Sequence, residues 1–314
     1  MPRKLRFIPP NTLVEVTAKT LQARFLLRPG TEMNRRYIGI LARAKARFGV
    51  KVHAVACLSN HHHLLVSPED AEQLASFMEY VQGNVAREIG SLHDWQGSFW
   101  WRRYDSILVS DEPEMQVRRV AYVLAQGCKE GLVARPELWP GVHSVFALRE
   151  GIPLRGVWYD RTAFALESRG RQTAGLDEFA TEEALELDPL PCWEKAGLSI
   201  EEMQSRIAEL VEVIAEDAAA EHRAKGTRPA DPEVFLRVHP HQRPAATKRS
   251  PAPRVHAILP EVRAAFEEAY RLFSEAFRDA AARLKRGMKP KLAVGFPGGS
   301  FPPGLPFVPL LEPG

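Results

Sequence analysis

The chain has only three cysteines in 314 residues, and they lie far apart in the sequence. Cys57, Cys128 and Cys192 form no C-x-x-C pair, which argues against a zinc knuckle and against a disulfide framework. Isolated thiols of this kind fit a reducing compartment. The cysteine pattern therefore predicts a cytoplasmic protein.

Long hydrophobic runs are absent as well. No stretch approaches the roughly 18 apolar residues that a membrane-spanning helix requires. The basic N-terminus, MPRKLRFIPP, is not followed by the apolar core of a secretory signal. With 45% hydrophobic and 26% charged residues, the composition is ordinary for a soluble protein. We therefore expect no membrane partner. A length of 314 residues allows one sizeable domain plus an extension, or two domains.

Acidic residues are scarce at the start of the chain. Up to Lys51, twelve lysines and arginines stand against two acids, Glu15 and Glu32, although the net charge of the whole chain is only +3. A local positive excess favours a polyanionic partner such as nucleic acid. The alternative is a solvated basic helix face, which would account for the basic cluster at 43–47 without any partner.

The stretch 51–68, KVHAVACLSNHHHLLVSP, is the most informative part of the sequence. Two short apolar runs rich in β-branched residues flank the polar pair Ser-Asn at 59–60, which predicts a β-hairpin. Side chains alternate faces along a strand, so His61 and His63 point the same way while His62 points to the other side. Two imidazoles side by side on a strand supply half of a metal site. The alternative is a solvated turn, which the apolar surroundings of the pair disfavour.

A second candidate stretch is 112–133, EPEMQVRRVAYVLAQGCKEGLV. Pro113 is typical of a helix start and Gly127 of a helix end, so we expect a helix between them. Tyr122 and Gln126 are four residues apart and would lie on one side of this helix, one turn from each other. By default, a tyrosine on a helix is simply a core or surface residue.

Aromatic residues and arginines alternate in the stretch 95–110, WQGSFWWRRYDSILVS. Single-stranded nucleic acid favours this pattern, because bases stack on aromatic rings for roughly 1 to 3 kcal/mol each and guanidinium groups hold phosphates. Trp100, Arg102 and Arg103 are therefore candidates for DNA contact, with Trp101 beside them. The alternative is that the aromatic residues only cover the sheet.

These three stretches resemble segments of the HUH single-tyrosine transposases, in particular the REP-associated tyrosine transposases. Residues 53–66 are similar to the family's LHAYVLMPNHVHLLV, the aromatic stretch to G-x-LWEGRYKSSLV, and the tyrosine helix to Y-I-E-L-N-P-V-R-A-G-L-V. Four departures are visible: Ser59 and Gly127 replace prolines, Gln126 stands where asparagine is common, and His62 occupies a hydrophobic position. Since that position points away from the metal, we expect His62→Val to stay active and to gain stability.

The resemblance covers about residues 10–146 and implies an activity. It implies a metal-dependent transposase or endonuclease that cleaves and rejoins single-stranded DNA through a 5′-phosphotyrosine intermediate. The DNA would carry hairpins formed by repetitive palindromic or inverted-repeat elements, the metal would be Mg²⁺ or Mn²⁺, and a homodimer is allowed. The residues concerned are the nucleophile Tyr122, the metal ligands His61, His63 and Gln126, and the DNA-contacting Arg102, Arg103, Trp100 and Lys129.

The predicted elements follow the order β, α, β, β, α, β, α, which indicates an α+β fold. The resemblance implies a ferredoxin-like antiparallel sheet with helices on one face, the HUH nuclease fold, over residues 1–150. Beyond it, residues 151–314 read as a mostly helical extension, to which the sequence assigns no role. Within this extension we expect helices at 199–225 and 259–284, a proline-rich linker at about 226–257, and a tail rich in proline and glycine.

Other functions remain open at this point. A domesticated DNA-binding protein of the same fold, without strand transfer, would show the same basic stretch. A two-histidine phosphoesterase would need a second H-x-T or H-x-S, which none of the ten histidines provides. A histidine-triad hydrolase needs H-x-H-x-H, whereas position 65 is leucine. Within the transposase interpretation, Tyr80 is a rival nucleophile, because Asn84 follows it by four residues.

The sequence predicts that affinity for DNA falls steeply as salt rises, because its basic residues would displace counterions from phosphates. The residues concerned are the positive excess before position 52 and the pair Arg102 and Arg103. Titration of single-stranded hairpin DNA at several salt concentrations measures this slope. A slope near zero would exclude a nucleic-acid role, and tighter binding of duplex than of single strand would count against stacking on the tryptophans.

Overall fold

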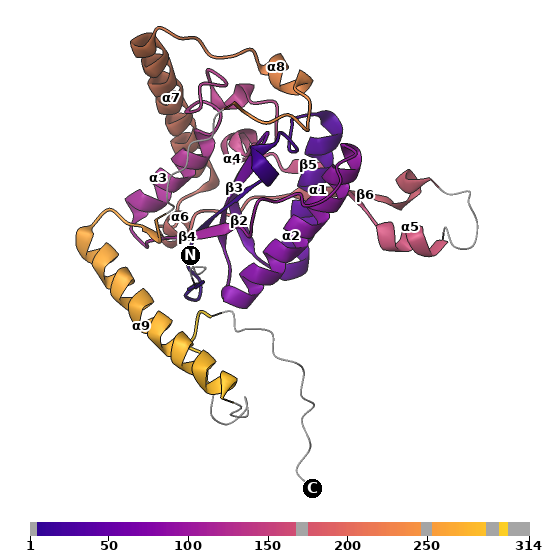
Figure 1. The fold of residues 1–314 in the computed structure, drawn as a ribbon. Helices are drawn as coiled ribbons and strands as arrows, with labels where there is room; N and C mark the ends of the chain where they lie inside the picture. Colours follow the sequence, from indigo (N-terminus) through magenta and orange to yellow (C-terminus); the bar gives the residue numbers. More distant parts are fainter. Residues whose placement is uncertain (1–4, 168–174, 246–252, 287–294, 301–314) are drawn as a thin grey trace.

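A five-stranded sheet forms the centre of the molecule in the computed structural model, which describes residues 5–167, 175–245, 253–286 and 295–300 (Figure 1). The strand order is β2-β3-β1-β4-β7, and every neighbouring pair is antiparallel except β4 with β7. The strands are β1 (Val14–Lys19), β2 (Lys51–Leu58), β3 (His61–Ser67), β4 (Asp105–Val109) and β7 (Val255–His256).

Two long helices connect these strands and cover one face of the sheet. They are α1 (Thr31–Phe48) and α2 (Ala71–Leu92). The chain order β1-α1-β2-β3-α2-β4, with the sheet order above, is that of a ferredoxin-like fold, so the predicted α+β class is confirmed. The glycine after α1, Gly49, has a φ of +70°, a left-handed conformation that ends helices and that glycine adopts without steric cost.

The opposite face of the sheet is also covered by helices, although the resemblance implied helices on one face. The helices there are α3 (Pro113–Leu124), α4 (Val145–Glu150), α6 (Pro191–Lys195) and α7 (Ile200–Lys225). The physical reason lies in β2, where every residue from Val52 to Leu58 is buried. A strand buried on both faces needs a covering layer on each side. Figure 1 shows α1 and α2 on one side of the sheet, with α3 and α7 on the other.

A two-stranded hairpin packs on α1, in a region that the sequence did not predict as strands. It consists of β5 (Leu154–Tyr159) and β6 (Ala180–Leu185), and at its far end lie α5 (Arg161–Glu167) and the short 3-10 helix η3 (Leu176–Phe179). The approach to α1 is close: a Cβ added to Gly39 would lie 2.1 Å from the carbonyl oxygen of Val157. The hairpin can sit here only because Gly39 has no side chain.

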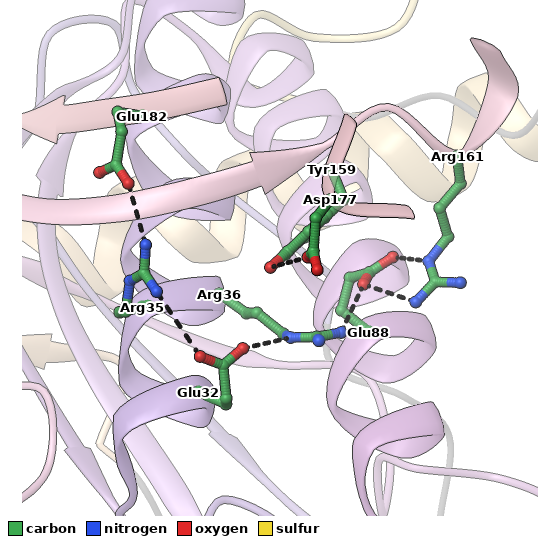
Figure 2. A network of polar contacts seen from close by, with 8 residues as sticks. All are labelled: Glu32, Arg35, Arg36, Glu88, Tyr159, Arg161, Asp177 and Glu182. Carbon is green, nitrogen blue, oxygen red and sulfur yellow. Dashed lines mark hydrogen bonds and ion pairs between the residues drawn. The ribbon is translucent and has the colours of Figure 1, made fainter. Parts of the chain in front are cut away.

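Ion pairs between α1, α2 and the hairpin region secure this packing (Figure 2). Glu88 on α2, only 3% exposed, accepts hydrogen bonds from Arg36 of α1 at 3.2 Å and from Nη2 of Arg161 at 2.9 Å. Arg35 of α1 donates to Glu182 of β6 at 2.9 Å. A buried carboxylate is stable only when such donors satisfy it. The network therefore ties the hairpin to the α1 and α2 layer.

The predicted helices of the C-terminal region are present as α7 and α9 (Pro260–Lys285). The region predicted as a linker is not wholly extended. Its described part contains α8 (Pro232–Arg237) and the strand β7, and residues 246–252 lie outside the described residues. The remaining short 3-10 helices are η1 (Leu21–Ala23) and η2 (Pro136–Leu138). A domain boundary near residue 150 stays a prediction, and packing of β5, α7 and β7 against the first part of the chain crosses it.

The described part of the tail, residues 295–300, docks against the N-terminal segment. Ile8 donates its N–H to the carbonyl of Gly299 at 3.0 Å, and the Phe296 ring lies 5.0 Å from Phe277 of α9. Phe7 stacks on Phe273 of α9 at 4.7 Å between ring centroids. Within the described residues, none of the helices has the length and apolar character needed to cross a membrane.

The close approach at Gly39 yields a test of the fold. Gly39→Ala should lower the free energy of unfolding by about 1–3 kcal/mol, because the new methyl group must displace the backbone of β5. Gly83→Ala is the matched control, since nothing lies within 4 Å of the added Cβ on α2 and alanine favours a helix by up to about 1 kcal/mol. Urea unfolding compares the two variants. Equal stability would contradict the described packing of the hairpin.

Candidate functional site

His61 and His63 share one face of β3, with their ring centroids 5.2 Å apart. The cross-strand partners of this face are Lys19, opposite His61, and Thr17, opposite His63. Glu15 lies two residues before Thr17, so strand alternation puts it on the same face. The alternation of side chains thus brings two histidines together with a carboxylate on the neighbouring strand.

Glu15 orients His63. The carboxylate is 1% exposed, and its Oε1 lies 3.0 Å from Nδ1 of His63. Because a carboxylate can only accept, Nδ1 of His63 is the donor and Nε2 keeps a free lone pair. A carboxylate behind a histidine in this way is the usual partner of a metal-binding imidazole.

The second oxygen of Glu15 gathers two more basic groups. Arg119 of α3 donates to Oε2, and Nε2 of His256 on β7 lies 3.1 Å from the same atom. Burial alone would raise the pKa of Glu15, but hydrogen bonding by His256 and His63 and the charge of Arg119 hold it well below its usual range. Glu15 is therefore a carboxylate at neutral pH despite its burial.

His61 is held in the matching state by its own neighbour. Its Nδ1 lies 2.7 Å from the side-chain oxygen of Asn60, so Nδ1 carries the proton and Nε2 keeps its lone pair. Burial, followed by the nearby His63 and Lys19, lowers the pKa of His61 well below its usual value. A neutral imidazole with a free Nε2 is the form that binds a metal ion.

Tyr122 stands beside this pair on α3. Its ring lies 5.6 Å from that of His63 between centroids, and the guanidinium of Arg119 is 3.9 Å from the centroid of the phenol ring. Nζ of Lys129 donates to the phenolic oxygen at 2.9 Å. Two cations flank the tyrosine, Lys129 at its hydroxyl and Arg119 over its ring.

Gln126 lies just beyond the end of α3, since the helix ends at Leu124 and not near Gly127 as predicted. The side chain is buried, and its Nε2 donates to the carbonyl of Tyr122 at 2.9 Å. The amide oxygen is therefore the atom that remains for a cation. Across the residues that the structure describes, no cluster of three or more His, Cys, Asp or Glu could hold a metal. Two imidazoles on one face of a strand suit a divalent ion, with an amide oxygen as the predicted third ligand.

The residues predicted to contact DNA do not all lie beside Tyr122. Trp100 packs on His62 at 5.3 Å between centroids and donates its indole N–H to the carbonyl of Gln82, so it covers the sheet face away from His61 and His63. Its neighbour Trp101 is 51% exposed, and its backbone N–H donates to the carbonyl of Lys19. Trp101 is thus the better placed of the two rings for stacking.

The charged candidates Arg102, Arg103 and Lys129 are exposed. Arg102 pairs with Asp105 at 2.6 Å, and Lys129 lies on the hydroxyl of Tyr122. A surface ion pair is weak and easily exchanged for a phosphate, so the pairing of Arg102 does not oppose its predicted role in DNA binding.

His62 has a structural partner that the sequence did not reveal. The side chain is fully buried, and its Nδ1 lies 2.8 Å from the hydroxyl of Tyr37 on α1. Burial lowers the pKa of His62 to about 3, so the ring is neutral, and its Nδ1 shares a hydrogen bond with the tyrosine hydroxyl. This contact predicts that His62→Val loses stability, the opposite of the expectation from the sequence, because valine would leave the buried hydroxyl without a partner.

The rival tyrosines lie elsewhere. Tyr80 stacks on Trp158 of β5 at 5.7 Å between centroids, on the side of α1 and α2, and Asn84 donates to its backbone carbonyl. Tyr104 is buried beneath the guanidinium of Arg6. Tyr122, in contrast, contacts a histidine of the pair.

Three residues of the site were not found from the sequence: Glu15, Arg119 and His256. Glu15 had a signal, since it is one of two acids in a basic stretch and lies on a predicted strand. Arg119 precedes Tyr122 by three residues on the same helix and so shares its face. For His256 the sequence carries no local signal, because β7 reaches the site only through the tertiary fold.

Residues 24–126 match the family model described as transposase IS200 like. This segment resembles the IS200-like transposases. It begins just before α1 and ends at Gln126, so it contains both histidines of the pair and Tyr122. The resemblance seen in the sequence is thereby confirmed, and the match supports a transposase role, that of a DNA-processing enzyme. Glu15 and His256 lie outside the matched segment.

Solved structures show weaker similarity. One is a REP-associated tyrosine transposase bound to a REP hairpin, with 16% identity and a TM-score of 0.39, over 46% of this chain and 82% of that one. Another is a putative transposase from Deinococcus radiodurans, with 18% identity and a TM-score of 0.28, over 38% and 94%. TM-scores this low do not establish a shared fold. Among curated proteins, none matched.

The pair formed by His62 and Tyr37 gives a stability test. His62→Val should cost about 1–3 kcal/mol, the penalty for a buried hydroxyl left unpaired. Adding Tyr37→Phe removes that hydroxyl and should recover most of the loss. Denaturant unfolding of the two single variants and the double variant measures the coupling. If His62→Val alone is as stable as the parent protein, the described bond does not contribute.

Proposed function

We propose that the protein is a metal-dependent single-stranded DNA transposase that cleaves and rejoins hairpin-bearing DNA through a 5′-phosphotyrosine intermediate. The observation that supports this most strongly is the position of Tyr122, whose ring contacts His63 while Lys129 donates to its hydroxyl. The matched transposase segment contains this tyrosine and both histidines.

Tyr122 is the nucleophile in this proposal. Its oxygen attacks a backbone phosphorus, the bond from phosphorus to the 3′ oxygen breaks, and the 5′ phosphate stays on the tyrosine. The phenolic proton is lost and the departing 3′ oxygen takes up a proton. A free phenol is a weak nucleophile, so the ammonium of Lys129 and the guanidinium of Arg119 help by stabilising the charge on the phenolate oxygen.

His61 and His63 would hold the metal ion through their Nε2 atoms, with the amide oxygen of Gln126 as the third ligand. A divalent ion supplies Lewis acidity and neutralises charge that develops on the phosphate oxygens. Mg²⁺ and Mn²⁺ are the candidates, and two imidazoles favour Mn²⁺. Glu15 contributes by fixing the ring of His63 and the tautomer that leaves Nε2 free.

The covalent bond to Tyr122 conserves the energy of the phosphodiester. A second DNA 3′ hydroxyl can therefore attack the phosphotyrosine and rejoin strands without ATP. Trp101, Arg102 and Arg103 provide an exposed ring and two cations for the single strand. A cytoplasmic location and a homodimer are further parts of this proposal.

A nuclease-dead DNA-binding protein of the same fold is the alternative, and it would bind hairpin DNA without forming an adduct. Tyr122→Phe tests both. This variant removes one oxygen and should abolish the covalent adduct with end-labelled single-stranded hairpin DNA, while leaving the affinity for DNA within about twofold because phosphate contacts supply most of it. Labelled protein on a denaturing gel is the measurement.

Tyr80→Phe is the matched control and should form the adduct at the parental rate. His61→Ala and His63→Ala should lose cleavage but keep DNA binding, since these residues serve the metal. An adduct that persists in Tyr122→Phe and vanishes in Tyr80→Phe would place the chemistry on α2. No adduct in the parent protein with either metal would favour the binding protein.

A further inference from the structure

One side chain of the C-terminal region, His256, reaches the carboxylate of the candidate site. Its Nε2 lies 3.1 Å from Oε2 of Glu15, the oxygen that also accepts from Arg119. His256 is the second of the two residues of β7 and lies opposite Val109 of β4. A residue more than a hundred positions beyond Tyr122 in the sequence thus contacts the carboxylate that orients His63.

Backbone and side-chain bonds fix the position of β7. Leu108 donates to the carbonyl of Arg254 at 3.2 Å, and Ser110 donates to the carbonyl of His256 at 3.0 Å. Just beyond, the carboxylate of Glu112 accepts from the N–H groups of Ile258 and Leu259 at 2.9 and 3.0 Å. Glu112 immediately precedes α3, the helix of Tyr122, so the strand is anchored at both the sheet and the catalytic helix.

We propose that His256 is a positioning residue of the nuclease site: it holds Glu15 so that Glu15 holds His63. This inference rests on the proposed function for its catalytic consequence, but its structural part does not. The matched segment 24–126 would then not hold the complete site, because Glu15 and His256 lie outside it.

The argument follows from how a carboxylate is oriented. Glu15 presents Oε1 to His63 and Oε2 to Arg119 and His256. Arg119 also lies over the phenol ring of Tyr122. Without His256, the position of Oε2 would therefore depend on the flexible side chain of Arg119 alone. Two nitrogen groups from different elements, Nη2 of Arg119 on α3 and Nε2 of His256 on β7, lie against Oε2 and confine the plane of the carboxylate. A fixed plane keeps the proton on Nδ1 of His63 and leaves Nε2 for the metal.

Substitutions at position 256 separate positioning from packing. His256→Leu fills similar space without a donor, and His256→Gln keeps an N–H that can reach Glu15. We expect His256→Leu and His256→Ala to slow single-turnover cleavage about 10-fold, at the lower end of the 10- to 100-fold typical for such partners. They should also need more Mn²⁺ for half-maximal rate. His256→Gln should recover to within about threefold of the parent, and affinity for DNA should stay unchanged in all three.

His222→Ala is the matched control, because this histidine bonds Thr227 at the exposed end of α7. The variant should cleave at the parental rate. If His256→Ala unfolds, the comparison of His256→Leu with His256→Gln still decides. Parental cleavage by His256→Leu, or a glutamine variant no better than leucine, would overturn the proposal.

A second readout does not depend on cleavage. In metal-free protein labelled with ¹⁵N-histidine, NMR should show His63 protonated at Nδ1 and unprotonated at Nε2 in the parent and in His256→Gln. In His256→Leu the two nitrogen shifts should move toward each other as the tautomers mix. Unchanged His63 shifts in that variant would refute the positioning role. A parent protein that forms no adduct but shows the expected shifts would refute the proposed function alone.

Discussion

The buried carboxylate of Glu15 is the interaction around which the candidate site is built. Transfer of a carboxylate from water into a protein interior costs several kcal/mol unless donors replace the lost hydration. Glu15 meets this requirement with hydrogen bonds from His63 of β3 and Arg119 of α3, and Nε2 of His256 on β7 lies 3.1 Å from its Oε2. Because β1 lies between β3 and β4 in the sheet, one carboxylate can reach all three. Three elements distant in sequence must converge on it, and this convergence sets the position of His63 relative to Tyr122.

The two faces of the sheet carry different tasks. On one face, α1, α2 and the β5 and β6 hairpin form a close-packed layer, with Gly39 and Glu88 allowing and securing the contact. His62 belongs to this layer through Tyr37. On the other face, His61 and His63 lie beside Tyr122 of α3, and α7 packs behind that helix. The alternation of side chains along β3 places His62 in the α1 and α2 layer and puts His61 and His63 on the face of Tyr122.

Local patterns predicted much of this arrangement. The hairpin, α1 and the placement of His61 and His63 follow from periodicities of two and of about 3.6 residues, and the helix of Tyr122 from its proline and its apolar spacing. The sequence could not reveal contacts between distant segments. His62 was read as a misfit because its partner Tyr37 lies on another element, and the β5 and β6 hairpin was missed because its second strand, ATEEAL, is acidic and mostly exposed. His256 was missed because a strand of two residues has no pattern of its own.

The central claim, that Tyr122 forms a covalent bond to DNA, is tested most directly by locating the bond. The adduct formed with a short hairpin DNA in Mn²⁺ would be digested with nuclease and trypsin and analysed by mass spectrometry. Cleavage after Arg119 and Lys129 gives the peptide 120–129, which contains Tyr122 as its single tyrosine. The account predicts nucleotide mass on this peptide. The same mass on the peptide that contains Tyr80 or Tyr104 would contradict it.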